Sequence, residues 1–236
     1  MSATNATALP PARFSLAGPK FGTALPVLLL VLTAVTGIVD AISVLELGRV
    51  FVANMTGNVV SIGFALAGAP HFSLTGSIFA LAGYILGAGL GGYVMARIHL
   101  APVRAFRNVM GVVVLAFAGV VAMAWITGAE APMIQHIMVA LMATALGVQG
   151  AAARALGVPD LSTTVLTMTI TGLVADIWGG KSGALTRRIL AVAAMLIGAF
   201  TGGVLVLNAG IPVALSVVLL IQIVVLVSMW DLARKS

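Results

Sequence analysis

The stretch VFVANMTGNVV, residues 50–60, decides how this chain folds. Its flanks are apolar, as in a membrane segment, but Asn, Met, Thr, Gly and Asn stand in succession at its centre. Two amides, a hydroxyl and a helix-weakening glycine are unfavourable in a helix surrounded by lipid. The stretch therefore predicts a break in a helix, at a place where protein or water surrounds the main chain.

The composition indicates an integral membrane protein. Of the 236 residues, 61% are hydrophobic and only 8% are charged, with a mean hydropathy of +1.19. Soluble domains carry about 25% charged residues. The chain has no cysteine, which excludes disulfides, thiolate metal sites and a cysteine nucleophile. Its net charge of +6 comes from basic residues between apolar runs, a pattern that indicates topology rather than a nucleic-acid partner.

Eight apolar stretches follow a polar N-terminal tail, residues 1–21, which we expect to be disordered. We expect no cleavable signal peptide, because the apolar run starts late and continues well past any plausible cleavage site. The stretches cover about residues 22–47, 50–68, 74–96, 108–127, 132–156, 161–179, 188–208 and 211–230. The second and sixth barely reach the roughly 20 residues that a spanning helix needs. We expect one membrane domain over 22–230 and a cytoplasmic tail over 231–236.

Three pairs of motifs predict an internal repeat. TAVTGIVDAI in the first stretch resembles ATALGVQGAA in the fifth, which aligns Gly37 with Gly147 at an offset of 110. VANMTGNV resembles TTVLTMTI, which aligns Thr56 with Thr167 at an offset of 111. GAGLGG and GAFTGG, which begin at residues 87 and 198, match at the same offset. The chain is thus predicted to have two four-segment halves, near residues 22–127 and 132–230.

The basic residues indicate how many stretches cross the membrane. If all eight cross, seven basic residues lie on one side and five on the other, which decides little. If the second and sixth stretches enter and leave by one face, eleven of the twelve share a side and only Arg49 remains opposite. The positive-inside rule favours this second arrangement, with both termini and the 97–107 loop in the cytoplasm.

The predicted fold is therefore an all-α polytopic membrane protein with six full crossings and two broken or re-entrant segments. Each half crosses three times, an odd number, so the second half is inverted relative to the first. Inverted repeats with a discontinuous helix in each half recur among secondary transporters.

The stretch GIVDAISVLELGRVFVANMTGNVVSIG, residues 37–63, resembles the signature of the YoaK-like family of uncharacterised bacterial integral membrane proteins. That signature has Gly-x-x-Asp-Ala in the first helix, followed by Phe-Val-Ala-Asn-Met-Thr-Gly-Asn. GVQGAAARALG and TTVLT, within residues 147–167, resemble its second motif, although Gly150 and Met168 replace an amide and a glycine there. The resemblance covers nearly the whole chain. It implies a multi-pass protein of the inner membrane but no reaction, because the family has no established activity.

Asp40 and the broken second stretch are the main candidates for a ligand- or ion-binding site. Asp40 is the one acidic residue well inside a predicted span, and such residues usually face a cavity or a partner. The alternative is a structural hydrogen bond to the neighbouring second stretch. The candidates in that stretch are Asn54, Thr56, Gly57 and Asn58. These residues either contact a ligand or brace the break in the helix.

The second half supplies further candidates. Gln149 lies one residue before the repeat counterpart of Asp40. Thr163, Thr164 and Thr167 lie in the sixth stretch, where the alternative is a hydrogen bond to the helix's own main chain. The stripe Gly83, Gly87 and Gly91 predicts close helix packing within the chain, with a homodimer as the alternative. The three histidines are dispersed, so neither a metal site nor a cofactor is expected.

These features favour a small secondary transporter or permease-like protein that binds an unknown small molecule or ion beside Asp40 in the lipid bilayer. The alternatives are an intramembrane enzyme and a non-transporting assembly or sensor protein. Against an enzyme, the chain has no cysteine, no central histidine, no Gly-x-Ser-x-Gly elbow and no second deep carboxylate. No catalytic residue is therefore assigned, and the repeat favours transport by analogy of fold.

Overall fold

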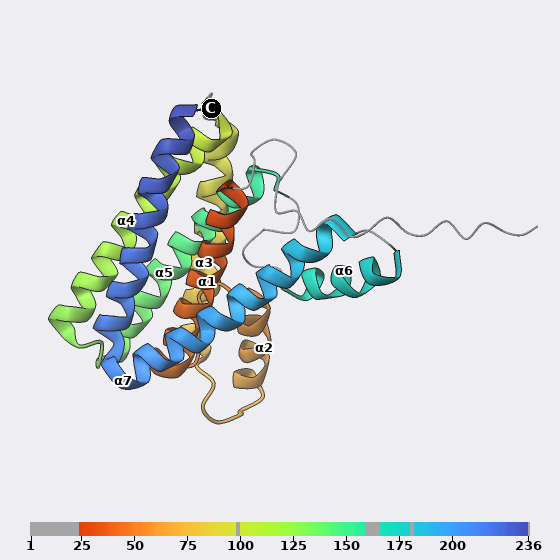
Figure 1. Cartoon of the computed structure of the whole chain (residues 1–236). Helices are drawn as coiled ribbons and strands as arrows, with labels where there is room; N and C mark the ends of the chain where they lie inside the picture. The colour runs from red at the N-terminus through yellow and green to blue at the C-terminus, as the bar shows by residue number, and fades with distance from the viewer. Residues whose placement is uncertain (1–23, 98–99, 159–165, 180–181, 236) are drawn as a thin grey trace, which may run out of the picture.

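The computed structural model describes residues 24–97, 100–158, 166–179 and 182–235, and these residues form helices and connecting turns without any strand (Figure 1). The helices are α1 (Ala24–Glu46), α2 (Met55–Leu66), α3 (Leu74–Arg97), α4 (Pro102–Thr127), α5 (Pro132–Ala155), α6 (Leu166–Gly179) and α7 (Ser182–Lys235). Of these, α1, α3, α4, α5 and α7 are long and apolar enough to cross a membrane. The all-helical class is confirmed.

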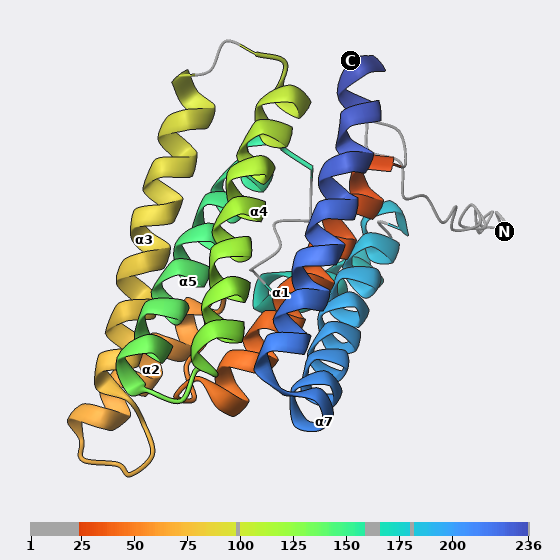
Figure 2. The ribbon, with the colours of Figure 1, turned by 90° about the vertical axis from the view of Figure 1, so that its left-hand side faces the viewer.

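The helices α1 and α5 form the centre of the bundle (Figure 2). In their most apolar windows 61% and 56% of the residues are buried, against 22–33% in α3, α4 and α7. α1 packs mainly against α7 and α5 mainly against α3, while α4 fills the space between α5 and α7. The outer helices expose large apolar side chains, among them Leu86, Leu115 and Leu196. That distribution suits contact with lipid.

The helix α7 is bent into two limbs. Gly210 has φ 80° and ψ 172°, outside the helical region, and Pro212 follows two residues later. Glycine adopts such a positive φ without a steric cost, and proline cannot donate the helical hydrogen bond. From this bend both limbs lead back toward the end of the bundle where the C-terminus lies (Figures 1 and 2). The two limbs correspond to the predicted seventh and eighth stretches.

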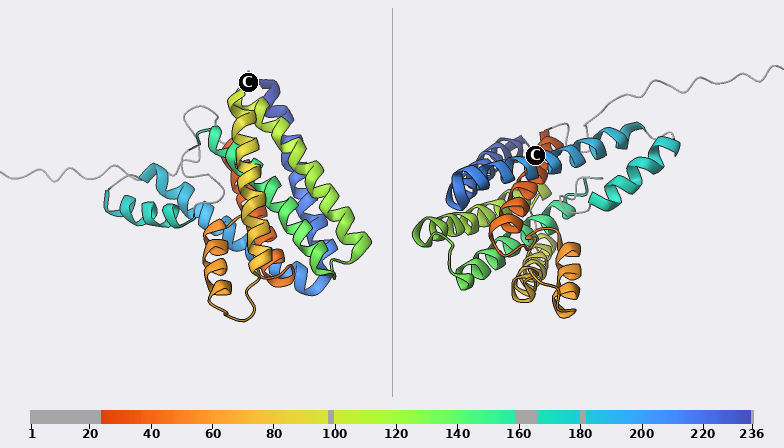
Figure 3. Two further views of the ribbon diagram at one scale, coloured as in Figure 1. Left: turned by 180° about the vertical axis from the view of Figure 1, so that it is seen from behind. Right: turned by 90° about the horizontal axis from the view of Figure 1, so that it is seen from below.

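The helices α2 and α6 are short and correspond to the predicted second and sixth stretches. With 12 and 14 residues they are about 18 and 21 Å long, less than the roughly 30 Å of a bilayer's hydrocarbon core. α2 starts partway along the bundle and ends near the end where α1 stops and α3 begins (Figure 1). α2 packs on α3 and α6 on α7, both outside the central helices, and the two short helices do not touch (Figure 3).

Two helix crossings are so close that only glycine fits. On α7, Gly198 and Gly202 face the carbonyl oxygens of Ala34 and Ile38 on α1. Where α3 crosses α5, the equivalent pairs are Gly87 with Thr144 and Gly91 with Val148. A methyl group added to any of these glycines would lie 2.6 Å or less from a main-chain oxygen. The glycine stripes therefore pack helices within the chain, as the sequence indicates.

The two crossings use positions that differ by a constant step along the chain. Gly37 of α1 meets the main chain at Met195 and Ala199, and Gly147 of α5 meets it at Tyr84 and Ala88. Gly147 follows Gly37 by 110 residues along the chain. Met195 and Ala199, which contact Gly37, each come 111 residues after Tyr84 and Ala88, which contact Gly147. These are the offsets of the matched sequence motifs.

Candidate functional site

The connection between α1 and α2, residues 47–54, is not helical although much of it is buried. Val50, Val52 and Ala53 are 0–3% exposed. A buried main chain outside a helix needs partners for its N–H and C=O groups. Asp40 supplies two of them, because its Oδ1 accepts hydrogen bonds from the N–H groups of Val52 at 2.9 Å and Ala53 at 3.0 Å.

These hydrogen bonds place the connection alongside α1. Asp40 lies six residues before Glu46, the last residue of α1, which is about 9 Å along the helix axis. After Glu46 the chain must therefore turn back toward the middle of the bundle before α2 begins. Gly48 and Arg49 make this turn with φ values of 87° and 57°, both in the left-handed region. That conformation costs a non-glycine residue such as Arg49 energy, which the surrounding contacts must offset.

Asn58, in the first turns of α2, holds the same connection at Phe51. Its Nδ2 donates to the carbonyl oxygen of Phe51 at 2.6 Å, and its Oδ1 accepts from the N–H of Phe51 at 2.9 Å. Its side chain is fully buried. A carboxamide is the side chain that offers a donor and an acceptor side by side, which explains the choice of asparagine.

Gly57 lets the start of α2 lie against the ring of Phe51. A methyl group on Gly57 would come within 2.6 Å of Cδ2 and 2.7 Å of Cε2 of that ring. The N–H of Gly57 donates to the carbonyl oxygen of Asn54 at 3.0 Å, which starts the helix. Of the predicted site residues, Asp40 of α1 and Asn58 of α2 thus hold the break in the helix by hydrogen bonds, and Gly57 lets α2 pack against it.

Asn54 and Thr56 have a different surrounding. Both side chains are exposed, and the side chain of Asn54 does not cap α2. The first N–H groups of a helix lack partners within the helix. The start of α2 therefore presents an amide, a hydroxyl and main-chain donors at one place, where they can contact a bound group.

The second carboxylate oxygen of Asp40 has no hydrogen-bond partner within the described part of the chain. This Oδ2 atom is buried, and the residue as a whole is 4% exposed. A buried charged oxygen without a donor is costly. A proton on Oδ2, or a cation beside it, would remove that cost. Asp40 can therefore serve the fold with one oxygen and bind an ion with the other.

The candidates of the second half are not joined to this site by any hydrogen bond between described residues. Gln149 is 1% exposed, and its Oε1 is buried without a partner in that part of the structure. Thr167 is exposed in the first turn of α6, and its carbonyl oxygen accepts a hydrogen bond from Thr171 at 3.0 Å. Thr163 and Thr164 lie outside the described residues.

Gln222 in the second limb of α7 and Ser77 in α3 are buried polar side chains that were not predicted from the sequence. Both are fully buried, and the polar atoms of both have no hydrogen-bond partner among the described residues. A lone amide in the apolar stretch 211–230 was the available signal for Gln222. Ser77 gave no signal, because small hydroxyl residues are common in membrane helices.

Comparison with known proteins supports a membrane protein. Residues 28–228 match the model of a family described as a protein of unknown function, DUF1275. Over 153 residues the chain is 36% identical to the UPF0700 transmembrane protein YoaK of Bacillus subtilis, a match that covers 64% of this chain and 65% of the relative. No solved structure matches. The chain therefore belongs to the DUF1275 family, a YoaK-like family of membrane proteins of unknown function.

Proposed function

We propose that this chain is a secondary transporter or permease-like protein of the bacterial inner membrane. In this proposal α1, α3, α4, α5 and the two limbs of α7 make six crossings, while α2 and α6 enter only partway. The two halves are inverted relative to each other. The matched crossings of α1 with α7 and of α3 with α5, at offsets of 110 and 111 residues, support such a repeat.

The distribution of charge supports an orientation with the C-terminus in the cytoplasm. Five arginines lie at the helix ends on the side of the bundle where α3, α5 and α7 end and α4 begins: Arg97, Arg104, Arg107, Arg154 and Arg234. At the opposite end of the bundle, where α1 and α4 end and α3 and α5 begin, the described charged residues are Glu46, Arg49 and Glu130. An excess of arginine marks the cytoplasmic side of a membrane protein.

The observation that carries the proposal is the connection 47–54, which turns back beside α1 and leads into the short helix α2. Non-helical main chain at membrane depth is tolerated where it is buried in protein or lines a water-filled cavity. In transporters the ends of such half-helices contact the substrate or the coupling ion. Asn54 and Thr56, exposed at the start of α2, are the proposed ligand contacts.

Asp40 would link an ion to this half-helix. Its Oδ1 holds Val52 and Ala53 just before α2, and its Oδ2 is free to take a proton or a cation. Hydrogen bonds to a charged acceptor are about twice as strong as those to a neutral one. Neutralising the carboxylate therefore weakens its hold on the connection, so occupancy of Oδ2 would control how firmly α2 is fixed.

Uptake into proteoliposomes tests this function. A panel of metabolites is first screened for thermal stabilisation of the purified protein, and stabilising solutes are then tested for uptake under a pH or sodium gradient. Asp40→Asn keeps an acceptor for Val52 and Ala53 but removes the titration, so it should fold, bind the solute and lose gradient-driven uptake. Asp231→Asn, at the exposed end of α7, is the control. Unchanged gradient dependence in Asp40→Asn would contradict the coupling role, and no solute uptake across the panel would contradict transport.

A further inference from the structure

An arginine of α4 stacks on a tryptophan of α7 at the proposed cytoplasmic end of the bundle. The guanidinium carbon of Arg107 lies 4.5 Å from the centroid of the Trp230 ring. The Nε and Nη2 atoms of Arg107 also donate to Oδ1 of Asn108, at 3.2 and 2.9 Å. Stacking on an aromatic face and a two-point hydrogen bond fix the plane of the guanidinium group.

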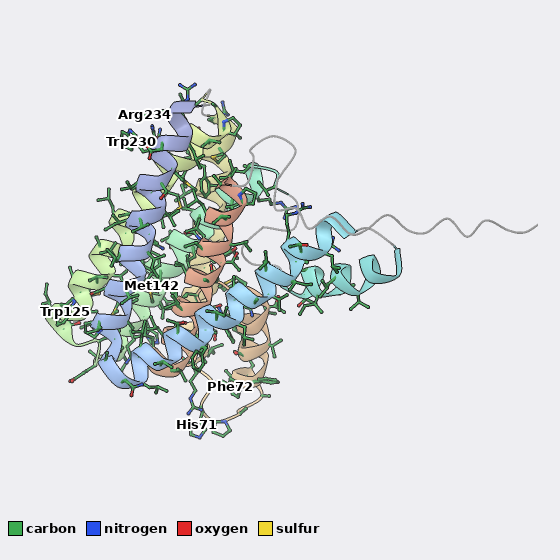
Figure 4. All side chains as sticks on the ribbon, viewed as in Figure 1. His71, Phe72, Trp125, Met142, Trp230 and Arg234 are labelled. Atoms are coloured by element: carbon green, nitrogen blue, oxygen red, sulfur yellow. The ribbon has the colours of Figure 1, made fainter. Side chains whose placement is uncertain are left out.

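Two more arginines extend this cluster toward the end of the bundle. Arg104 lies one turn before Arg107 on α4, and Arg234 lies one turn after Trp230 on α7. Residues three or four apart share a face of a helix. Both guanidinium groups are exposed, and neither forms an ion pair in the described part of the chain. Trp230 and Arg234 lie together at this end (Figure 4).

The surface beside this cluster is apolar. Below Arg107 the outer face of α4 exposes Val112 and Leu115, and below Trp230 the second limb of α7 exposes Val224 and Val227, each more than half exposed. Such a face suits lipid chains, and tryptophan is enriched at the level of the headgroups. The three arginines therefore lie where the headgroup of a lipid in contact with α4 and α7 would be.

We propose that Arg104, Arg107 and Arg234 bind the phosphate of an anionic phospholipid, with Trp230 as the platform that orients Arg107. Guanidinium groups bind phosphate oxygens in pairs of hydrogen bonds. Basic sites between membrane helices on the cytoplasmic side recognise anionic headgroups. On α4 and α7, the two helices that carry the cluster, Asp231 is the one acidic residue, so these helices keep an excess of positive charge at this end. Phosphatidylglycerol fits this excess, whereas phosphatidylcholine brings a cation of its own.

Fluorescence quenching by brominated lipids tests the site. In the variant Trp125→Phe/Trp178→Phe the remaining tryptophan is Trp230, within the proposed site. The protein is reconstituted in phosphatidylcholine vesicles that contain equal mole fractions of either brominated phosphatidylglycerol or brominated phosphatidylcholine. Brominated phosphatidylglycerol should quench Trp230 more strongly. The preference for phosphatidylglycerol should fall about fivefold for each of the three arginines replaced by glutamine. One basic residue near an anionic surface contributes about 1 kcal/mol to binding, which corresponds to this factor.

Two further variants separate the site from a general effect of charge. Arg49→Gln, at the opposite end of the bundle, should leave the preference unchanged. Arg107→Lys keeps the charge but not the planar group, so it should lose part of the preference. Equal quenching by the two lipids, or a preference that survives the replacement of all three arginines, would overturn the proposal. So would displacement of the brominated lipid by soluble glycerol phosphate or by an oligonucleotide, because another phosphate would then be the ligand.

Discussion

The side chain of Asn58 forms hydrogen bonds with both main-chain polar groups of Phe51. Its Nδ2 donates to the carbonyl oxygen at 2.6 Å, and its Oδ1 accepts from the N–H at 2.9 Å. The second asparagine of the Asn-Met-Thr-Gly-Asn sequence therefore stabilises the non-helical connection between α1 and α2. Asp40 holds the next two residues of the same connection. Together the two side chains replace the hydrogen bonds that a continuous helix would have made at residues 51–53.

Replacing Asn58 by aspartate should destabilise the protein. The new oxygen would face the carbonyl oxygen of Phe51, so one hydrogen bond is lost and two acceptors oppose each other. We expect the free energy of unfolding to fall by about 2 kcal/mol or more. Asn54→Asp, four residues earlier and exposed, is the matched control and should change it by about 0.5 kcal/mol or less. Equal unfolding temperatures for the two variants in detergent would contradict the role of Asn58.

Two replacements of Asp40 should differ in stability. Asp40→Ala leaves the buried N–H groups of Val52 and Ala53 without an acceptor. Each unsatisfied group costs about 1–3 kcal/mol, so this variant should be strongly destabilised. Asp40→Asn keeps an acceptor oxygen and should lose only about 1–2 kcal/mol, the difference between a charged and a neutral acceptor. Thermal unfolding of both variants in the same detergent checks this order. If the alanine variant is as stable as the asparagine variant, Asp40 does not stabilise the connection through Val52 and Ala53.

The glycine crossings give a prediction with controls in the same helices. Gly198→Ala would place a methyl group against the carbonyl oxygen of Ala34, and Gly87→Ala would do the same at Thr144. Because main chain cannot move aside, the helices must separate, which should cost about 3 kcal/mol or prevent folding. Gly92→Ala meets no atom within 4 Å, and Gly203→Ala meets only Leu45 Cδ1 at 3.7 Å. Both controls should be neutral or stabilised by up to about 1 kcal/mol. Similar yields and unfolding temperatures for all four variants would show that the crossings tolerate a wider separation.

The sequence predicted the break in the second segment, because amides and glycine at the centre of an apolar run conflict with a lipid-facing helix. A structural hydrogen bond between Asp40 and that segment was the alternative to a binding role, and such bonds are present at Val52 and Ala53. The sequence did not predict which atoms Asp40 binds. That depends on how far the chain turns back after Glu46, which the left-handed conformations of Gly48 and Arg49 set. Those conformations follow from packing around the turn, and packing is not visible in a single sequence.

The arrangement of α7 shows another limit of the sequence. The two predicted stretches 188–208 and 211–230 are found, but they are joined at Gly210 without a loop. The second limb is further tied to α4 by a hydrogen bond of 3.1 Å from the Trp125 indole to Ser216. This contact joins residues 91 positions apart. Hydropathy reports which residues avoid water but not which helices lie side by side.

Labelling of two single-cysteine variants tests most directly whether α2 turns back within the membrane. The chain has no native cysteine, so Arg49→Cys and His71→Cys each introduce one thiol, before and after α2. A membrane-impermeant maleimide added to spheroplasts should label both positions, because a segment that enters and leaves by one face has both ends outside. Arg104→Cys should be labelled only after permeabilisation. If His71→Cys instead requires permeabilisation while Arg49→Cys does not, α2 crosses the membrane and the account of a half-helix held by Asp40 and Asn58 is contradicted.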